Sequence, residues 1–145
     1  VTGQSYGGIM TNWIIGHTNR FAAAVPRMSA SKWISMHATS SENWYGDFVL
    51  GGTPLDNPEL VWNQSALKYA ANVSTPTLFI QHELDRACPM EQAEQMFVAL
   101  LERGVPARML VNKHCYHGGR SVSQLLHDID AMLAWFGQWL GGDRA

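Results

Sequence analysis

The chain has 145 residues, of which 46% are hydrophobic and 15% are charged, and its formal net charge is -2. This length and composition fit one globular domain with a hydrophobic core, and the charge gives no reason to expect nucleic acid or an anionic membrane as a partner. Two cysteines are too few for a disulfide framework, and neither a bilayer-spanning apolar run nor a signal peptide is present, so we expect a cytoplasmic protein.

The chain opens on a Gly-x-Ser-x-Gly pattern, Gly3-Gln4-Ser5-Tyr6-Gly7. This pattern is typical of a sharp strand-to-helix turn that exposes a nucleophilic serine. The two glycines predict that the strand before Ser5 and the helix after it approach each other closely, because a Cβ there would collide. Five residues are a weak signal by themselves, since a glycine-rich loop can contain a serine without any catalytic role.

Helical and extended segments alternate along the rest of the chain, with no repeat and no linker. Apolar runs predict buried strands, and apolar residues at helical spacing predict amphipathic helices. The expected elements are a helix at 8–16, a strand at 21–25, short helices within the irregular segment 28–62, a strand at 76–81, a helix at 90–103, a strand at 107–111 and a final helix. This order predicts an α/β fold with a mostly parallel sheet and flanking helices.

The final helix carries apolar residues at helical spacing, and we expect them to face the core. They are Val122, Leu125, Leu126, Ile129, Leu133, Phe136 and Leu140. The neighbouring stripe of Trp135, Phe136, Trp139 and Leu140 is expected to pack in the core as well.

Acidic residues and histidines follow the two strands of the second half. Ligands and catalytic groups collect at the carboxyl ends of parallel strands, and an α/β-hydrolase needs a serine, an acid and a histidine in this chain order. After the strand at 76–81 the acid can be Glu83 or Asp85. After the strand at 107–111 the base can be His114 or His117.

The same two loops could instead be read as metal ligands. The residues in question are His82, Glu83, Asp85, His114, Cys115 and His117. No paired spacing such as Cys-x-x-Cys or His-Glu-x-x-His supports a metal site, so we expect neither a metal nor a cofactor. Cys88 and Cys115 are expected to be buried thiols.

Further segments stand out beside residues 3–13. They are Gly51-Gly52-Thr53-Pro54, Ser65-Ala66-Leu67-Lys68-Tyr69, Thr75-Pro76-Thr77-Leu78 and residues 88–95. Together they resemble the catalytic domain of prolyl oligopeptidase-family serine peptidases, the acylaminoacyl-peptidase branch above all, over essentially the whole chain. The resemblance implies a truncated α/β-hydrolase fold, in which residues 1–145 form a single partial catalytic domain that begins at the nucleophile strand.

The resemblance also implies a catalytic triad of Ser5 as nucleophile, Asp85 as acid and His117 as base. The N–H of Tyr6, directly after the nucleophile, is expected to donate to the oxyanion. The second donor of the family comes from an earlier loop that this chain does not contain.

Aromatic residues of the irregular segment lie where the family builds its substrate pocket. They are Trp33, Trp44, Tyr45 and Phe48, although a plain core role fits them equally well. One departure concerns the arginine that the family carries two residues after the acid to hold a substrate carbonyl. That position is Ala87 here, and Arg86 stands one place early.

We therefore expect a serine hydrolase that cleaves small carboxylic esters through an acyl-enzyme, with residual peptidase activity. The alternatives are a non-catalytic fragment of such a peptidase and a binding module that uses the crevice at the strand ends. Because the nucleophile strand lies in the middle of the sheet in this fold, its uncovered edge predicts a dimer or a higher homo-oligomer.

Overall fold

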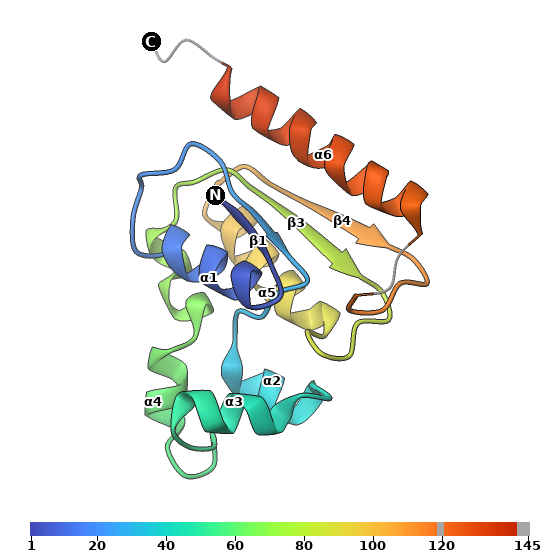
Figure 1. The fold of residues 1–145 in the computed structure, drawn as a ribbon. Helices are drawn as coiled ribbons and strands as arrows, with labels where there is room; N and C mark the ends of the chain where they lie inside the picture. The colour runs from blue at the N-terminus through green and yellow to red at the C-terminus, as the bar shows by residue number, and fades with distance from the viewer. Residues whose placement is uncertain (119–120, 142–145) are drawn as a thin grey trace.

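The computed structural model describes residues 1–118 and 121–141. Within them the chain forms a four-stranded parallel sheet flanked by helices (Figure 1). The strands lie in chain order: β1 (Thr2–Gln4), β2 (Val25–Arg27), β3 (Thr77–His82) and β4 (Ala107–Asn112). The predicted α/β class with a parallel sheet is confirmed.

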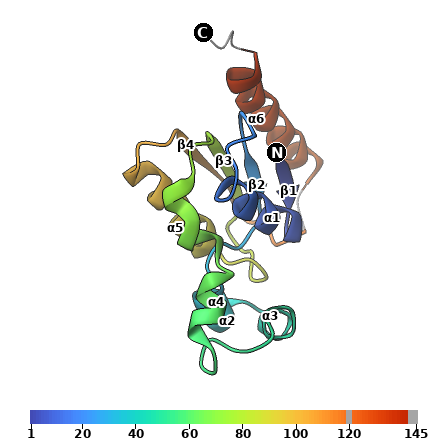
Figure 2. The ribbon, with the colours of Figure 1, turned by 90° about the vertical axis from the view of Figure 1, so that its left-hand side faces the viewer.

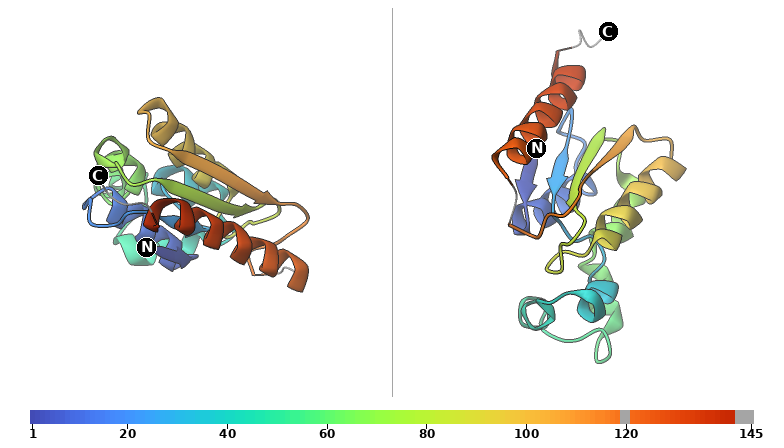
Figure 3. Two further views of the ribbon diagram at one scale, coloured as in Figure 1. Left: turned by 90° about the horizontal axis from the view of Figure 1, so that it is seen from above. Right: turned by 90° about the vertical axis from the view of Figure 1, so that its right-hand side faces the viewer.

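Helices lie on both faces of this sheet and beyond the carboxyl ends of its strands. They are α1 (Tyr6–Ile15), α2 (Trp33–Thr39), α3 (Asn43–Leu50), α4 (Pro58–Asn63), the 3-10 helix η1 (Ala66–Asn72), α5 (Met90–Glu102) and α6 (Val122–Leu140). Phe79 of β3 packs in a core cluster with residues of α1, η1 and α5, whereas its neighbours Leu78 and Ile80 pack on the other face with Trp135 of α6. The sheet therefore lies between α5 and α6, as the right-hand view of Figure 3 shows.

Helices α2, α3 and α4 project beyond the carboxyl ends of the strands (Figures 1 and 2). Their own small core contains Trp33, Met36, Leu50 and Val61, together with Cys88 from the loop before α5. This group of helices covers the edge of the sheet where catalytic side chains collect.

The strand predicted at residues 21–25 lies further along the chain than expected. It spans Val25–Arg27, and Ala24 forms only an isolated bridge with Thr77. Pro26 was expected to follow the strand, but it lies inside β2, opposite Gly3 of β1. Because proline has no N–H, Pro26 cannot donate a hydrogen bond to β3. This explains why β2 and β3 are paired only at Arg27, which lies opposite Ile80.

Helix α6 meets the sheet through Trp135, Phe136 and Trp139 of the aromatic stripe, as expected, and not through most of the aliphatic stripe. Val122, Leu126, Ile129, Leu133 and Leu140, all expected in the core, are exposed. The buried side consists of Asp128 and Trp135, with Phe136 and Trp139 packed at the margin of the core. Burial of large aromatic side chains contributes strongly to stability, which favours this orientation.

None of the described helices combines the length and the apolar character needed to cross a bilayer.

Candidate active site

Ser5 lies in the sharp turn between β1 and α1. Its backbone angles are φ 55° and ψ -120°, a conformation that costs energy for any residue except glycine. The turn is held on both sides, because the Ser5 N–H donates to the Arg27 carbonyl at 2.9 Å and the Ile9 N–H donates to the Ser5 carbonyl at 2.9 Å. The hydroxyl is thereby fixed at the carboxyl end of β1.

The glycines around Ser5 have unequal roles. A Cβ on Gly3 would lie 2.3 Å from the carbonyl atoms of Gly7, so this position admits no side chain. A Cβ on Gly7 would meet nothing within 4 Å. The expectation that a side chain at position 7 would collide is therefore wrong. The second crowded position is Gly8, where a Cβ would come within 2.6 Å of the Arg27 carbonyl oxygen. Close approach of α1 to β2 therefore depends on Gly8.

The structure brings Ser5, His117 and Asp85 together from three different loops. The Oγ of Ser5 lies 2.8 Å from Nε2 of His117, and Nδ1 of His117 lies 2.7 Å from Oδ2 of Asp85. The other carboxylate oxygen, Oδ1, accepts the N–H groups of Ala87 at 3.0 Å and Cys88 at 2.8 Å. Because the carboxylate is an acceptor, Nδ1 carries the proton of neutral His117 and Nε2 is free to accept the Ser5 hydroxyl proton.

The two rival residues lie outside this arrangement. Glu83 accepts the backbone N–H of His114 at 2.9 Å, and the His114 ring stands 3.8 Å from the same carboxylate oxygen. The His114 side chain is exposed. Glu83 and His114 thus partner each other at the surface, and the geometry favours Asp85 and His117 at the nucleophile.

The environment of His117 favours its charged form. The hydrogen bond to Asp85 raises the pKa of His117 above its ordinary value, the charges of Asp85 and Glu42 add to this, and partial burial opposes it. The carboxylate of Asp85 is fully buried, so its interaction with the imidazolium is little screened by solvent. The site is therefore suited to stabilising the imidazolium that forms when Ser5 loses its proton.

Cys88 and Cys115 are free and buried, as expected. Burial and the nearby charge of Asp85 raise the pKa of the Cys88 thiol to about 12. The thiol of Cys88 lines the same cavity as Ser5 but stays protonated near neutral pH, so it does not compete as a nucleophile.

His82 fixes the loop that carries His117. Its Nδ1 lies 2.6 Å from the Tyr116 carbonyl oxygen, and since that oxygen can only accept, Nδ1 carries a proton. The His82 ring is wholly buried, and Nε2 has no partner among the described residues. The role of His82 was missed from the sequence, where it was weighed only as a metal ligand. Among the described residues no group of three or more His, Cys, Asp or Glu could hold a metal ion.

A cavity of about 320 Å³ opens at the nucleophile. It is lined by Ser5, Tyr6, Ile9, Trp33, Met36, Glu42, Ala87, Cys88 and His117. A second cavity of about 180 Å³ shares Tyr6, Ile9 and Trp33 with it and continues toward α3 and α4. The two together offer a largely apolar surface beside the Ser5 hydroxyl.

The predicted pocket residues have different positions. Trp33 lines both cavities. Trp44 and Phe48 line neither cavity and are 63% and 83% exposed on α3, so their placement in the pocket was wrong. Tyr45 also lies in α3, and its side chain is outside the part of the chain that the structure describes. The lining residues Met36 and Glu42 were missed, since nothing in the irregular segment distinguishes them.

Tyr6 begins α1, and its N–H belongs to the first turn, where donors have no acceptor within the helix. The positive end of the helix dipole lies at the same point. This N–H is thus available to an oxyanion formed next to Ser5.

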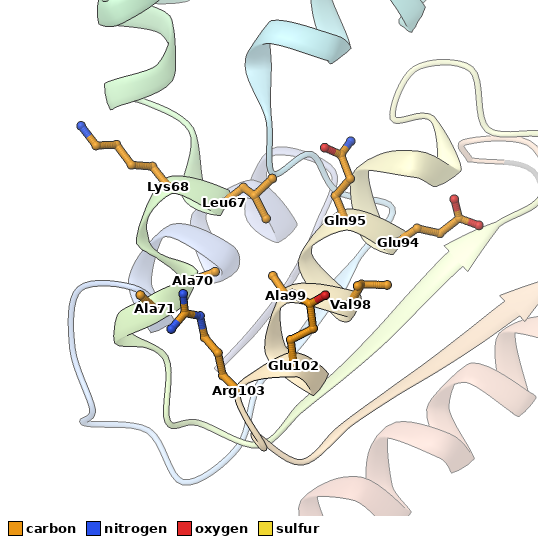
Figure 4. A pocket seen from close by; sticks show the side chains of 10 residues that line it. All are labelled: Leu67, Lys68, Ala70, Ala71, Glu94, Gln95, Val98, Ala99, Glu102 and Arg103. Carbon is orange, nitrogen blue, oxygen red and sulfur yellow. The ribbon is translucent and has the colours of Figure 1, made fainter.

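Another cavity, of about 510 Å³, lies between η1 and α5 (Figure 4). Its lining mixes small apolar residues such as Ala70 and Ala99 with the charged Lys68, Glu94 and Arg103. None of Ser5, Asp85 and His117 lines this groove.

Comparison with known proteins decides the family. The sequence model of the prolyl oligopeptidase family matches residues 1–143. The chain belongs to the prolyl oligopeptidase family. Its membership confirms the resemblance inferred from the sequence and accounts for the parallel sheet and the elbow at Ser5.

Relatives within the prolyl oligopeptidase family are much longer than this chain. An uncharacterized peptidase of Bacillus subtilis, YuxL, is 42% identical over 97% of the chain, which covers 22% of that protein. Dipeptidyl-peptidase 5 of Porphyromonas gingivalis is 32% identical over 95% of the chain, which covers 21% of that protein. The chain thus spans about a fifth of the length of the curated relatives it matches.

Solved structures of the family superpose closely. An acylaminoacyl peptidase of Pyrococcus horikoshii matches with a TM-score of 0.91 and 28% identity over 100% of this chain and 24% of its own. A puromycin hydrolase matches with a TM-score of 0.90 and 25% identity over 99% of this chain and 22% of its own. The four-stranded sheet and its helices therefore correspond to part of an α/β-hydrolase peptidase.

Proposed function

We propose that this prolyl oligopeptidase-family chain is a serine hydrolase that cleaves small carboxylic esters through an acyl-enzyme on Ser5, with residual activity on peptides. The observation that carries the proposal is the continuous contact from the Ser5 hydroxyl to His117 and on to the buried Asp85, at 2.8 and 2.7 Å. Both distances lie within the range in which a proton passes between donor and acceptor.

The proposed reaction has two halves. Ser5 Oγ attacks the ester carbonyl carbon while its proton moves to Nε2 of His117, and the imidazolium then gives that proton to the departing alkoxide. Water attacks the acyl-enzyme in the second half, with His117 again taking a proton and returning it to Ser5 as the acid leaves. General base catalysis of this kind contributes about 10² to 10⁴-fold, and Asp85 holds the imidazole in the required tautomer.

Esters are the proposed substrates because an activated ester depends less on oxyanion stabilisation than a stable amide does. Among the described residues we identify one donor, the N–H of Tyr6. Loss of a single donor typically lowers the rate by about 10² to 10³-fold, which an activated ester tolerates better than a stable amide. Peptide substrates remain the secondary proposal, in keeping with the names of the family relatives.

The acyl group is proposed to occupy the paired cavities beside Ser5. Ile9, Trp33 and Met36 provide apolar walls, and Ala87 leaves room at the position where the family resemblance implies an arginine. A short or medium apolar acyl chain fits this lining.

We also propose that the protein forms a dimer or a higher homo-oligomer. β1 is an edge strand of the described sheet, so one side of its backbone has no strand partner. Multi-angle light scattering at micromolar concentration measures the mass directly, and a monodisperse monomer would contradict this proposal.

The hydrolase proposal is tested with p-nitrophenyl butyrate. The protein should release p-nitrophenol, Ser5→Ala should reduce kcat to background, and Ser74→Ala should leave it unchanged. Ser74 is a matched control because it is exposed and lies outside the lining of the cavity at Ser5. Equal rates for the protein and Ser5→Ala would remove Ser5 from the mechanism. No activity in either would favour a non-catalytic fragment or a binding module.

A further inference from the structure

Glu42 lies between α2 and α3 and lines the same cavity as Ser5 and His117. No pattern in the sequence singled out Glu42 itself. Its position next to the nucleophile makes it a group that a bound substrate would contact.

The backbone at Glu42 is tied to the loop that follows Asp85. The Ser41 N–H donates to the Arg86 carbonyl at 2.7 Å, and the Ser40 hydroxyl donates to the Ala87 carbonyl at 2.7 Å. The Glu42 N–H in turn donates to the Ser40 Oγ at 2.9 Å. These hydrogen bonds fix the backbone of Glu42 beside the catalytic cavity, which its side chain lines.

Glu42 gives this cavity a negative charge. Among the described residues that line it, Glu42 is the one carboxylate, and no lysine or arginine lines it. The negative charge of Glu42 interacts with the catalytic base, because it contributes to the raised pKa of His117. When His117 is neutral, as a general base must be, the lining is anionic and attracts a cation.

The surroundings of Glu42 suit an ammonium group in particular. No salt bridge joins Glu42 to another described residue, so the carboxylate is available to a ligand. A carboxylate and an ammonium form a charge-assisted hydrogen bond. Tyr6 and Trp33 line the same cavity, and aromatic rings attract cations through their π faces.

We propose that Glu42 is a specificity-determining residue that binds a cationic amino group of the substrate. The substrate class is then aminoacyl esters, and peptides with a free amine close to the scissile carbonyl. This inference rests on the proposed function, because it takes the cavity at Ser5 as the place where the carbonyl binds.

Binding is measured first in the Ser5→Ala protein, which cannot turn over the ligand. Isothermal titration calorimetry compares L-alanine p-nitroanilide with N-acetyl-L-alanine p-nitroanilide, at a pH where the free amine is protonated. We expect the cationic ligand to bind about fivefold more tightly, as a solvent-exposed ion pair allows. Glu42→Gln should abolish the difference, and added salt should reduce it.

Two further variants sharpen the binding experiment. Glu94→Gln makes the same chemical change on α5, where Glu94 lines the separate groove of Figure 4, and it should preserve the preference. Glu42→Lys should reverse the selectivity toward N-succinyl-L-alanine p-nitroanilide, which carries a carboxylate. The proposal would be overturned if L-alanine p-nitroanilide and its N-acetyl derivative bind equally or not at all. It would also be overturned if Glu42→Gln keeps the preference for the free amine.

Turnover separates this inference from the proposed function. With the p-nitrophenyl esters of the same two acyl groups, the parent protein should show the same preference in kcat/KM, and Glu42→Gln should remove it. A binding preference without hydrolysis of either ester would reject the hydrolase while supporting Glu42 as the amine site. Hydrolysis of both esters at equal kcat/KM would reject the role of Glu42 and leave the hydrolase standing.

Discussion

Replacing Asp85 by asparagine changes one group at the centre of the proposed triad. The Asp85 carboxylate accepts Nδ1–H of His117 at 2.7 Å and two backbone N–H groups at 2.8 and 3.0 Å. In Asp85→Asn the amide oxygen can keep the two backbone bonds, so the amide nitrogen is turned toward His117. Nδ1 must then accept, the proton moves to Nε2, and Nε2 can no longer accept the Ser5 proton.

The expected loss in kcat is about 10⁴-fold, the effect typical of fixing the wrong tautomer in a triad. The pKa of His117 should fall as well, because the hydrogen bond to Asp85 is the largest cause of its elevation. The assay is the initial rate of p-nitrophenyl butyrate hydrolysis, with urea unfolding to show that the variant is folded. Asp130→Asn on the exposed side of α6 is the matched control. A folded Asp85→Asn variant that keeps a tenth or more of the activity would refute the reasoning.

Three other predictions follow from the geometry. The raised pKa of His117 predicts that kcat/KM falls on the acidic side with a midpoint above about pH 6.5. The pair of protonated His117 and Asp85 also stabilises the folded protein; this contribution is complete below the pKa of His117 in the unfolded chain and is lost as the pH rises through its pKa in the folded protein. Urea unfolding of the protein and of His117→Gln at several pH values would measure it. Gly3→Ala should destabilise the fold by about 1 to 3 kcal/mol in urea unfolding, because its Cβ meets backbone at 2.3 Å, whereas Gly7→Ala should be neutral or stabilising. His82→Leu should leave the Tyr116 carbonyl unpaired and lower kcat more than it raises KM, and His82→Asn, which can still donate, should restore part of kcat.

Strong local patterns predicted much of the second half of the chain. β3, α5 and β4 begin and end within about a residue of expectation, because each is a continuous apolar run or a clear helical repeat bounded by proline or glycine. β2 was displaced because its proline was read as a stop, and only the neighbouring strands decide which backbone groups need partners. Two apolar sides of α6 were expected in the core; the aromatic one packs there and most of the aliphatic one is exposed, because the sequence does not say which side meets the sheet.

The candidate site was predictable where topology dictates it. Parallel strands place their following loops at one edge of the sheet, so the order of serine, acid and histidine was enough to expect them together, and the family resemblance selected Asp85 and His117. The need for glycine at position 8 rather than 7 depends on the distance between α1 and β2, which no local pattern encodes. Glu42 lies at the cavity because its neighbours Ser40 and Ser41 donate hydrogen bonds to the distant residues Ala87 and Arg86, contacts that only the folded chain reveals.

The most direct test of the central claim is mass spectrometry of the protein during turnover of p-nitrophenyl acetate. An acetyl group should appear on the peptide containing Ser5, and it should be absent in Ser5→Ala and strongly reduced in His117→Ala. Acetylation confined to other residues, or hydrolysis with no covalent intermediate on Ser5, would contradict it.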